Sequence, residues 1–453
     1  MHADTKSKSV YSVFNLLLIS ILPLCGSVQG VLAQERVVLD LDKTLEMAKE
    51  KNLYIKSAAI DHHIALEDIR EVKEERLPNF QLHALYSRVS NISEFQQGIK
   101  HKPTVTRINP EIYDLTSNFN VPIYNGRKIN NHIKIAKLAA EIAHLEQGET
   151  ANTVYLHAAE MFLEVCKLQE LQKLISESIH EEKDRLREVK VLHEKGVVTK
   201  NEILRAELQL SQREFQFLTN TKNINVLKDE LKTTLQLPLT TELDIDENSI
   251  SAINTDLNSY VDLKQHANQN ESILISQELL KIKELELKNV KSNYLPKIQG
   301  FGHYGFKYPN YMFFPPTNYL YTFGQIGVEA TWDLSSLYKN RIKVQTAKNK
   351  VHKQEVENKI LLDKVDNLIF RQYAEYNDLL EKVEVTEKAE KLADENHRIV
   401  SLKYLNQMVL ITEMMDADNN KLKAKFNVIE NRIEILQKKY EILHTTNLIS
   451  HHK

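Results

Sequence analysis

The sequence predicts a mainly helical protein in which long coiled-coil helices are interrupted by two β-hairpins, and three observations support this fold class. The first is composition, because the 453 residues include only 11 glycines and 10 prolines while 27% are charged, as in long helices. The second is a pair of segments in which aromatic and β-branched residues alternate, as in strands. The third is a duplication of the whole arrangement along the chain.

The duplication appears as matched positions at a fixed separation. Pro78 follows a charged run and precedes an aromatic stretch, and Pro296 does the same 218 residues later. Further along, Ala206 matches Ala417 at an offset of 211, so the first hairpin is longer than the second by about seven residues. These offsets are far longer than a solenoid unit. The chain is therefore predicted to be a duplicated half-protein with internal pseudo-two-fold symmetry.

Residues 1–33 are predicted to be a secretory signal peptide. Lys6 and Lys8 precede the apolar stretch Val10–Leu24, which is too short to span a bilayer as a helix but suits an export signal. Cys25 raises the alternative of a lipoprotein signal, although the Pro-Leu pair before it fits that kind of signal poorly.

The first structural repeat is predicted over residues 34–245. After a helix at 42–76 and a hairpin at about 79–124, a long helix is expected at about 127–192, where there is one glycine and no proline. Its apolar residues recur in steps of three and four, which is typical of a coiled coil. At 1.5 Å per residue this helix would be roughly 100 Å long. The remaining elements of this repeat are a tip at about 193–199 and a shorter helix at 200–236.

The second structural repeat, residues 246–453, is predicted to follow the same order. Its elements are a helix, a hairpin at about 297–334, a long helix at about 337–402, a tip at about 403–410 and a shorter helix at 411–446. Residues 236–262 are rich in Pro, Thr, Asp and Asn, and we interpret them as a linker between the halves. Cys166, which lies among apolar residues, is expected to be a buried and unreactive thiol.

The hairpins indicate a membrane β part. Tyr319, Tyr321 and Phe323 alternate along one predicted strand. Strands of about ten residues with aromatic residues near their ends suit an outer-membrane barrel, and the smallest such barrels have eight strands. Four strands cannot close a barrel alone, and their exposed edges would be an aggregation hazard. Several copies of the chain must therefore each donate four strands.

Composition and motifs argue against several other classes of protein. A net charge of −3 implies no general attraction to nucleic acid. The sequence has no phosphate-binding loop, no catalytic-triad spacing and no Cys/His zinc cluster, so neither an enzyme nor a cofactor is expected. His62 and His63 are adjacent on a predicted helix and diverge, so no metal site is expected from them.

Four segments, in order, are similar to those of a known family. Arg76–Pro78 leads into the first hairpin, Val121–Arg127 leads out of it, and the tip segments are Leu192–Ala206 and Lys403–Ala417. In order, spacing and duplication, the chain resembles the TolC family of outer-membrane efflux ducts over essentially its whole mature length.

The resemblance implies a fold, a place and a function. Three protomers would build a trimeric α-barrel of long coiled-coil helices and one shared twelve-stranded β-barrel in the outer membrane of a Gram-negative bacterium, in contact with its lipid. The homotrimer would be the exit duct of a tripartite efflux system with a periplasmic tunnel. It would passively export small molecules that a periplasmic adaptor (membrane fusion) protein and an inner-membrane RND or ABC-type pump deliver. Two alternatives remain open: a duct for type I protein secretion, and a periplasmic coiled-coil scaffold without a pore.

The resemblance also implies a periplasmic gate. Glu413 and Asp416 match acidic positions that line the family's entrance, where three-fold symmetry would form a ring of carboxylates that attracts cations. The alternative for this pair is a solvated helix face. Glu202 and Tyr404 match positions that bond between neighbouring coils and hold the entrance shut, and simple packing of Tyr404 is the alternative. The family often has an arginine where this chain has Val409.

The two tips are the expected docking sites for the adaptor. Gly196 and Val197 form the first, where glycine would supply a left-handed turn at the end of the helix. Gln407 and Met408 form the second, where the family usually has glycine in place of Gln407.

Overall fold

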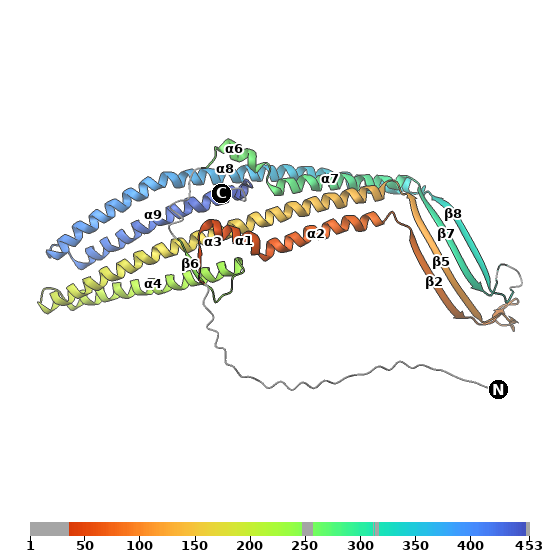
Figure 1. The fold of residues 1–453 in the computed structure, drawn as a ribbon, viewed down its shortest axis with the longest axis horizontal. Helices are drawn as coiled ribbons and strands as arrows, with labels where there is room; N and C mark the ends of the chain where they lie inside the picture. Colours follow the sequence, from red (N-terminus) through yellow and green to blue (C-terminus); the bar gives the residue numbers. More distant parts are fainter. Residues whose placement is uncertain (1–35, 247–256, 311, 313–316, 450–453) are drawn as a thin grey trace, which may run out of the picture.

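The protein is a long, narrow molecule with helices along most of its length and a sheet at one end (Figure 1). This computed structural model describes residues 36–246, 257–310, 312 and 317–449. The predicted signal peptide and Cys25 lie outside the described residues. The predicted fold class is confirmed, since the chain is mainly helical with a separate four-stranded sheet.

The elements of the two repeats follow one another in the same order. The first repeat contains β1 (Arg36–Leu39), α1 (Leu41–Lys51), α2 (Leu53–Glu74), β2 (Asn79–Arg88), the short ribbon β3 (Ile92–Glu94) and β4 (Thr104–Thr106), β5 (Glu111–Tyr124), α3 (Lys128–Glu194) and α4 (Lys200–Thr234). The first repeat ends with β6 (Glu242–Ile245), and the second contains α6 (Tyr260–Ala267), α7 (Glu271–Lys291), the 3₁₀ turn η1 (Ser292–Tyr294), β7 (Lys297–Tyr308), β8 (Tyr321–Thr331), α8 (Ser336–Leu405) and α9 (Ile411–Thr445).

The long helices α3 and α8 each run without a break beside two shorter helices. Asn52 caps α2 by accepting a hydrogen bond from the Tyr54 amide at 2.8 Å, and its own amide donates to the Thr234 carbonyl at the end of α4 at 3.0 Å. In the second repeat the N-cap of α7, Asn270, donates in the same way to the Thr445 carbonyl at the end of α9, also at 3.0 Å. One asparagine therefore satisfies the ends of two helices, and the short helices stack end to end.

The largest hydrophobic core lies near the middle of the molecule and joins the two repeats. Phe162 and Leu163 of α3 are fully buried there with Leu231 of α4, against Leu436 of α9. This packing holds the two repeats together where α3 and α4 of the first meet α9 of the second.

Part of the predicted linker is wrong. Within residues 236–262, β6 pairs in parallel with β1, with Arg36 opposite Glu242, and α6 begins at Tyr260. A strand of four residues has too short an alternating pattern to be recognised, and its partner strand lies near the other end of the first repeat.

The sheet has the order β2-β5-β7-β8 and is antiparallel throughout, so that among the described residues β2 and β8 are its two open edges. Strand pairing places Phe80, Phe119, Gly302 and Ile326 in one row across the four strands, and it places Gln81, Asn118, His303 and Gln325 in the next row. Because successive side chains point to opposite faces, one face is apolar and the other is polar. We call these the apolar face and the polar face.

Much of the apolar face is exposed in the single protomer. Its exposed large side chains include Phe80, Leu82, Tyr304, Phe306, Ile326 and Val328. No helix among the described residues combines the length and the apolar character that a membrane span requires.

Candidate functional site

The two tips lie at the end of the molecule opposite the sheet, where α3 turns into α4 and α8 turns into α9 (Figure 1). Gly196 and Gln407 both have left-handed backbone, with φ of 73° and 59°. The amide of Val197 donates to the Leu192 carbonyl at 2.9 Å, and the Met408 amide makes the same bond to Lys403 at 2.9 Å. The two turns therefore have the same shape, although one uses glycine and the other glutamine.

Replacing Gln407 with glycine is expected to raise the free energy of unfolding by about 1 kcal/mol, because a left-handed residue with a side chain is strained. Thermal unfolding of the variant measures this gain. Gly196→Ala is the matched control and should lose a similar amount. A loss of stability in both variants would mean that the glutamine side chain itself stabilises the second tip.

The acidic pair of the candidate gate faces solvent in the single protomer. Glu413 and Asp416 are exposed on the first turns of α9, and neither has an ion-pair partner among the described residues. Their neighbours Met414 and Ala417 are buried, so the acidic pair points away from the packed side of the helix.

Tyr404 and Glu202 come close without a hydrogen bond between them. Tyr404 is buried in a tip cluster with Val189, Ile411 and Met414, and its hydroxyl has no hydrogen-bond partner within the described parts of the chain. Burial, followed by the negative charge of Glu202, raises the pKa of Tyr404. A buried hydroxyl without a hydrogen-bond partner is unusual in a folded protein.

A buried charge cluster that was not predicted lies beside the candidate gate residues on α9. The Arg185 guanidinium of α3 is 2.9 Å from the Asp418 carboxylate of α9 and 3.6 Å from Glu182. His397 Nε2 of α8 lies 2.8 Å from the other oxygen of Asp418. Glu182, Arg185 and Asp418 are only 1%, 7% and 6% exposed. The buried charge cluster thus ties the α3–α4 pair to the α8–α9 pair.

Burial sets the electrostatics of this cluster. It raises the pKa of Asp418 to about 6, against the opposing effect of Arg185. It also raises the pKa of Glu182, with Asp418 as the next cause. The pKa of His397 is lowered by burial and then by Lys421. Both acids are therefore easier to protonate than free carboxyls, while the histidine favours its neutral form.

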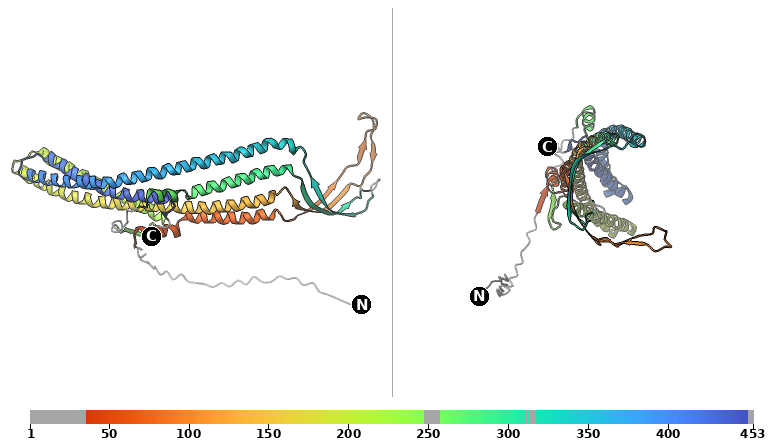
Figure 2. Two further views of the ribbon diagram at one scale, coloured as in Figure 1. Left: turned by 90° about the horizontal axis from the view of Figure 1, so that it is seen from above. Right: turned by 90° about the vertical axis from the view of Figure 1, so that its right-hand side faces the viewer.

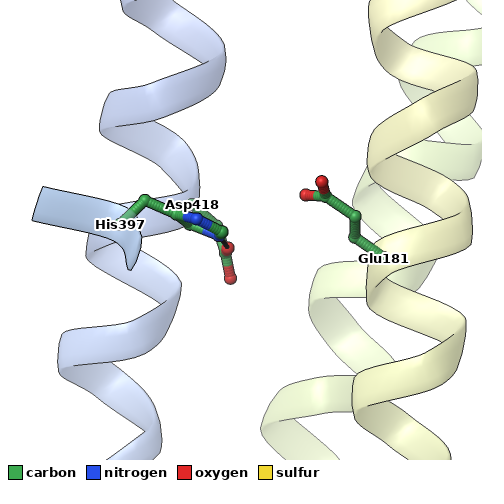
Figure 3. A group of neighbouring side chains, drawn as sticks. All are labelled: Glu181, His397 and Asp418. Carbon is green, nitrogen blue, oxygen red and sulfur yellow. Dashed lines mark hydrogen bonds and ion pairs between the residues drawn. The ribbon is translucent and has the colours of Figure 1, made fainter. Parts of the chain in front are cut away.

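Three residues at the edge of this cluster have ligand atoms within 4.8 Å of one another: Glu181, His397 and Asp418. Figure 3 shows Glu181 on α3 pointing toward the other two across the contact between the helix pairs. One imidazole and two carboxylates suit zinc. However, Lys421 already holds Glu181 at 2.8 Å, and Arg185 holds Asp418, so a metal ion would have to displace two cations.

Comparison with known proteins tests the resemblance. Residues 44–235 match the family model described as "Outer membrane efflux protein". No curated protein matches the chain.

Solved structures match almost the whole chain. VceC, an outer membrane protein from Vibrio cholerae, is 15% identical with a TM-score of 0.70, covering 90% of this chain and 95% of its own. The CmeC outer membrane channel from Campylobacter jejuni is also 15% identical with a TM-score of 0.70, covering 95% and 93%. CusC has a TM-score of 0.74 at 10% identity, covering 90% and 91%.

The resemblance to the TolC-like efflux proteins is confirmed. The family match falls on the first repeat, and the structural matches extend the TolC-like fold to the second. This family is one of channels rather than enzymes. In the TolC-like fold of this chain, the tips, the candidate gate and the buried charge cluster all lie in the half that carries no sheet (Figure 1).

Proposed function

We propose that the protein is the outer-membrane exit duct of a tripartite efflux system and that it works as a homotrimer. The observation that carries this proposal is the sheet, because its apolar face is exposed and its edge strands β2 and β8 are open. Three copies that pair β8 of one protomer with β2 of the next would close a barrel of twelve strands. Lipid would cover the apolar face, and the polar face would line the path.

The helical part would form the periplasmic tunnel and its gate. Val197 and Met408 are exposed apolar residues at the tips, and they suit a contact with a periplasmic adaptor protein. An inner-membrane pump of the RND or ABC type would supply the energy, and the duct itself would be passive. The adaptor would bias the tips between closed and splayed arrangements.

The native mass of the protein extracted in detergent from outer membranes tests the proposal. A mass of three protomers is expected. A soluble monomer would contradict it and favour a periplasmic scaffold. A duct for type I protein secretion would give the same trimer, so deletion strains should also be compared for drug susceptibility and for secreted protein.

Replacing both Glu413 and Asp416 with alanine is expected to lower the cation preference of the channel and to weaken block by multivalent cations. Three protomers would place six of these carboxylates around one entrance, where they attract cations. Reversal potentials in a planar bilayer measure the change. The control is Glu46→Ala with Glu50→Ala, which removes two exposed carboxylates from α1. If the wild type, the acidic-pair variant and the control variant have equal selectivity, Glu413 and Asp416 do not act in the gate.

A further inference from the structure

A cavity of about 300 Å³ lies where the second hairpin joins its helices, between the helical ends of β7 and β8 and the start of α8. Three of its lining residues are lysines, Lys297, Lys339 and Lys343, and Asp333 is the one carboxylate among them. Lys297 pairs with Thr331 across the two strands. We call this cavity the lysine pocket.

The lysine pocket belongs to the polar face of the sheet. The strand pairs alternate between the two faces, and the pair formed by Lys297 and Thr331 lies two residues from the polar pair of Gln299 and Glu329. Those two side chains are joined by a hydrogen bond of 2.7 Å, which occupies the carboxylate of Glu329. The pocket therefore opens on the side that would line the path, away from the apolar face.

Its positive charge is not neutralised by ion pairs. Within the described ranges no carboxylate forms an ion pair with Lys297, Lys339 or Lys343, although the charge of Asp333 offsets part of theirs. The Asp333 carboxylate accepts hydrogen bonds from the Ser335 amide at 3.0 Å and from its hydroxyl at 2.6 Å, at the start of α8. These bonds, more than the nearby Lys339, lower the pKa of Asp333.

A fourth lysine reports the same excess of charge. Lys128 of α3 donates to Asn293, another residue of the pocket wall, at 2.5 Å. Burial lowers the pKa of Lys128, and the positive charges of Lys297 and Lys343 lower it further. Four ammonium groups therefore lie around one small region, and a bound anion would reduce the repulsion between them.

Ser336 gives an independent sign of a missing ligand. It is the first residue of α8, lines the lysine pocket and is only 7% exposed. Its hydroxyl has no hydrogen-bond partner among the residues described. Leaving such a group unpaired costs about 1–3 kcal/mol. The Asp333 carboxylate already accepts the amide at the start of α8, so this hydroxyl and the lysines are the groups that remain for an oxyanion.

We propose that the lysine pocket binds a phosphate or carboxylate group of a passing solute, so that the cargo of the duct includes anionic solutes even though its entrance favours cations. This inference rests on the proposed function, since only in a duct does the polar face line a path. Each protomer contributes one pocket, and the trimer presents three at the junction between tunnel and barrel. A lipid headgroup has the same chemistry, but the pocket lies on the face opposite the one that lipid would cover.

Inorganic phosphate is the probe for a direct binding test on the detergent-purified full chain by isothermal titration calorimetry. The wild type should bind phosphate, and Lys297→Gln with Lys343→Gln should weaken the affinity by roughly a hundredfold, as expected for the loss of two charge-assisted hydrogen bonds. The matched control, Lys49→Gln with Lys51→Gln, removes two exposed lysines from α1 and should bind as the wild type does. Ser336→Ala should weaken binding without lowering the melting temperature, because its hydroxyl has no partner to lose. Absent phosphate binding in the wild type, or equal binding in all variants, would overturn the site.

A second measurement separates this inference from the proposed function. In a planar bilayer of neutral phosphatidylcholine, the Lys297/Lys343 variant should shift the chloride-to-potassium permeability ratio toward potassium by roughly threefold. If the wild-type protein forms no channel, the proposed function is wrong, and the inference of anionic cargo fails with it even if phosphate binds. If the wild type conducts and the variant has the same selectivity, only the inference of anionic cargo is wrong. Loss of phosphate binding in phosphatidylglycerol nanodiscs would instead assign the pocket to a lipid headgroup.

Discussion

Replacing Arg185 with methionine is expected to lower the free energy of unfolding by about 3–5 kcal/mol, the cost of removing one partner from a buried ion pair. Asp418 and Glu182 would both remain buried, and the nearest compensating cation would be gone. The loss falls on the contact between α3 and α9, near the tips. Chemical denaturation measures the free energy, and limited proteolysis of the tip region measures the local loosening.

Two controls isolate the charge from the packing in this experiment. Asp418→Asn keeps the size and the hydrogen-bonding atoms, so it should cost less than Arg185→Met. The double variant Arg185→Met with Asp418→Leu replaces the pair by apolar side chains and should recover part of the loss. A cost below about 1 kcal/mol for Arg185→Met would mean that water already solvates and screens these charges in the folded protein.

The same carboxyl makes stability depend on pH in a defined direction. The pKa of Asp418 is raised to about 6 in the folded protein from 3.8. The folded state therefore holds this proton more tightly than the unfolded state. The stabilising contribution is complete below about pH 4 and is lost as the pH rises to about 6. Asp418→Asn should flatten that part of the stability profile.

Replacing Ile326 with arginine is expected to remove the protein from the outer-membrane fraction. Ile326 lies on the apolar face and is 84% exposed in the single protomer. An arginine facing lipid near the middle of a barrel costs about 2–4 kcal/mol, and a trimer would bear that cost three times. Membrane fractionation and the trimer band on a native gel measure the outcome.

Gln325→Arg is the matched control, since the residues are neighbours on β8 and face opposite sides of the sheet. This variant should remain a membrane-inserted trimer, because the polar row of Gln81, Asn118 and His303 accommodates a charge in water. If both arginine variants insert equally well, the apolar face does not meet lipid and the proposed duct is wrong.

Local signals in the sequence predicted much of the fold. The absence of breakers over about 127–192 and the steps of three and four indicate a helix that the structure places at Lys128–Glu194. Alternating residues indicate the strands, because a side chain's face in a sheet is set by its position along the strand. The left-handed turn at Gly196 followed from glycine itself, and the equal turn at Gln407 could not, since glutamine rarely adopts it.

The buried charge cluster could not be predicted by the same means. Arg185, Glu182 and Asp418 read as ordinary surface charges on helices in which charged residues are frequent. Only a contact between residues 233 positions apart buries them together. The lysine pocket is similar, because Lys297 belongs to a strand and Lys343 to the following long helix, and neither position is unusual alone.

The stacked helix ends have a mechanical consequence. An unbroken helix resists bending along its whole length, whereas two helices that meet end to end transmit little bending moment across the joint. Figures 1 and 2 show that α4 meets α2, and α9 meets α7, near the middle of the molecule, and Asn52 and Asn270 make the hydrogen bonds at these two joints. A sideways force on the tips is therefore resisted at that level mainly by α3 and α8, while α4 and α9 move with the long helices against which they pack. Because of the duplication each repeat has one such joint, and the continuous helices α3 and α8 set the bending stiffness of the molecule at that level.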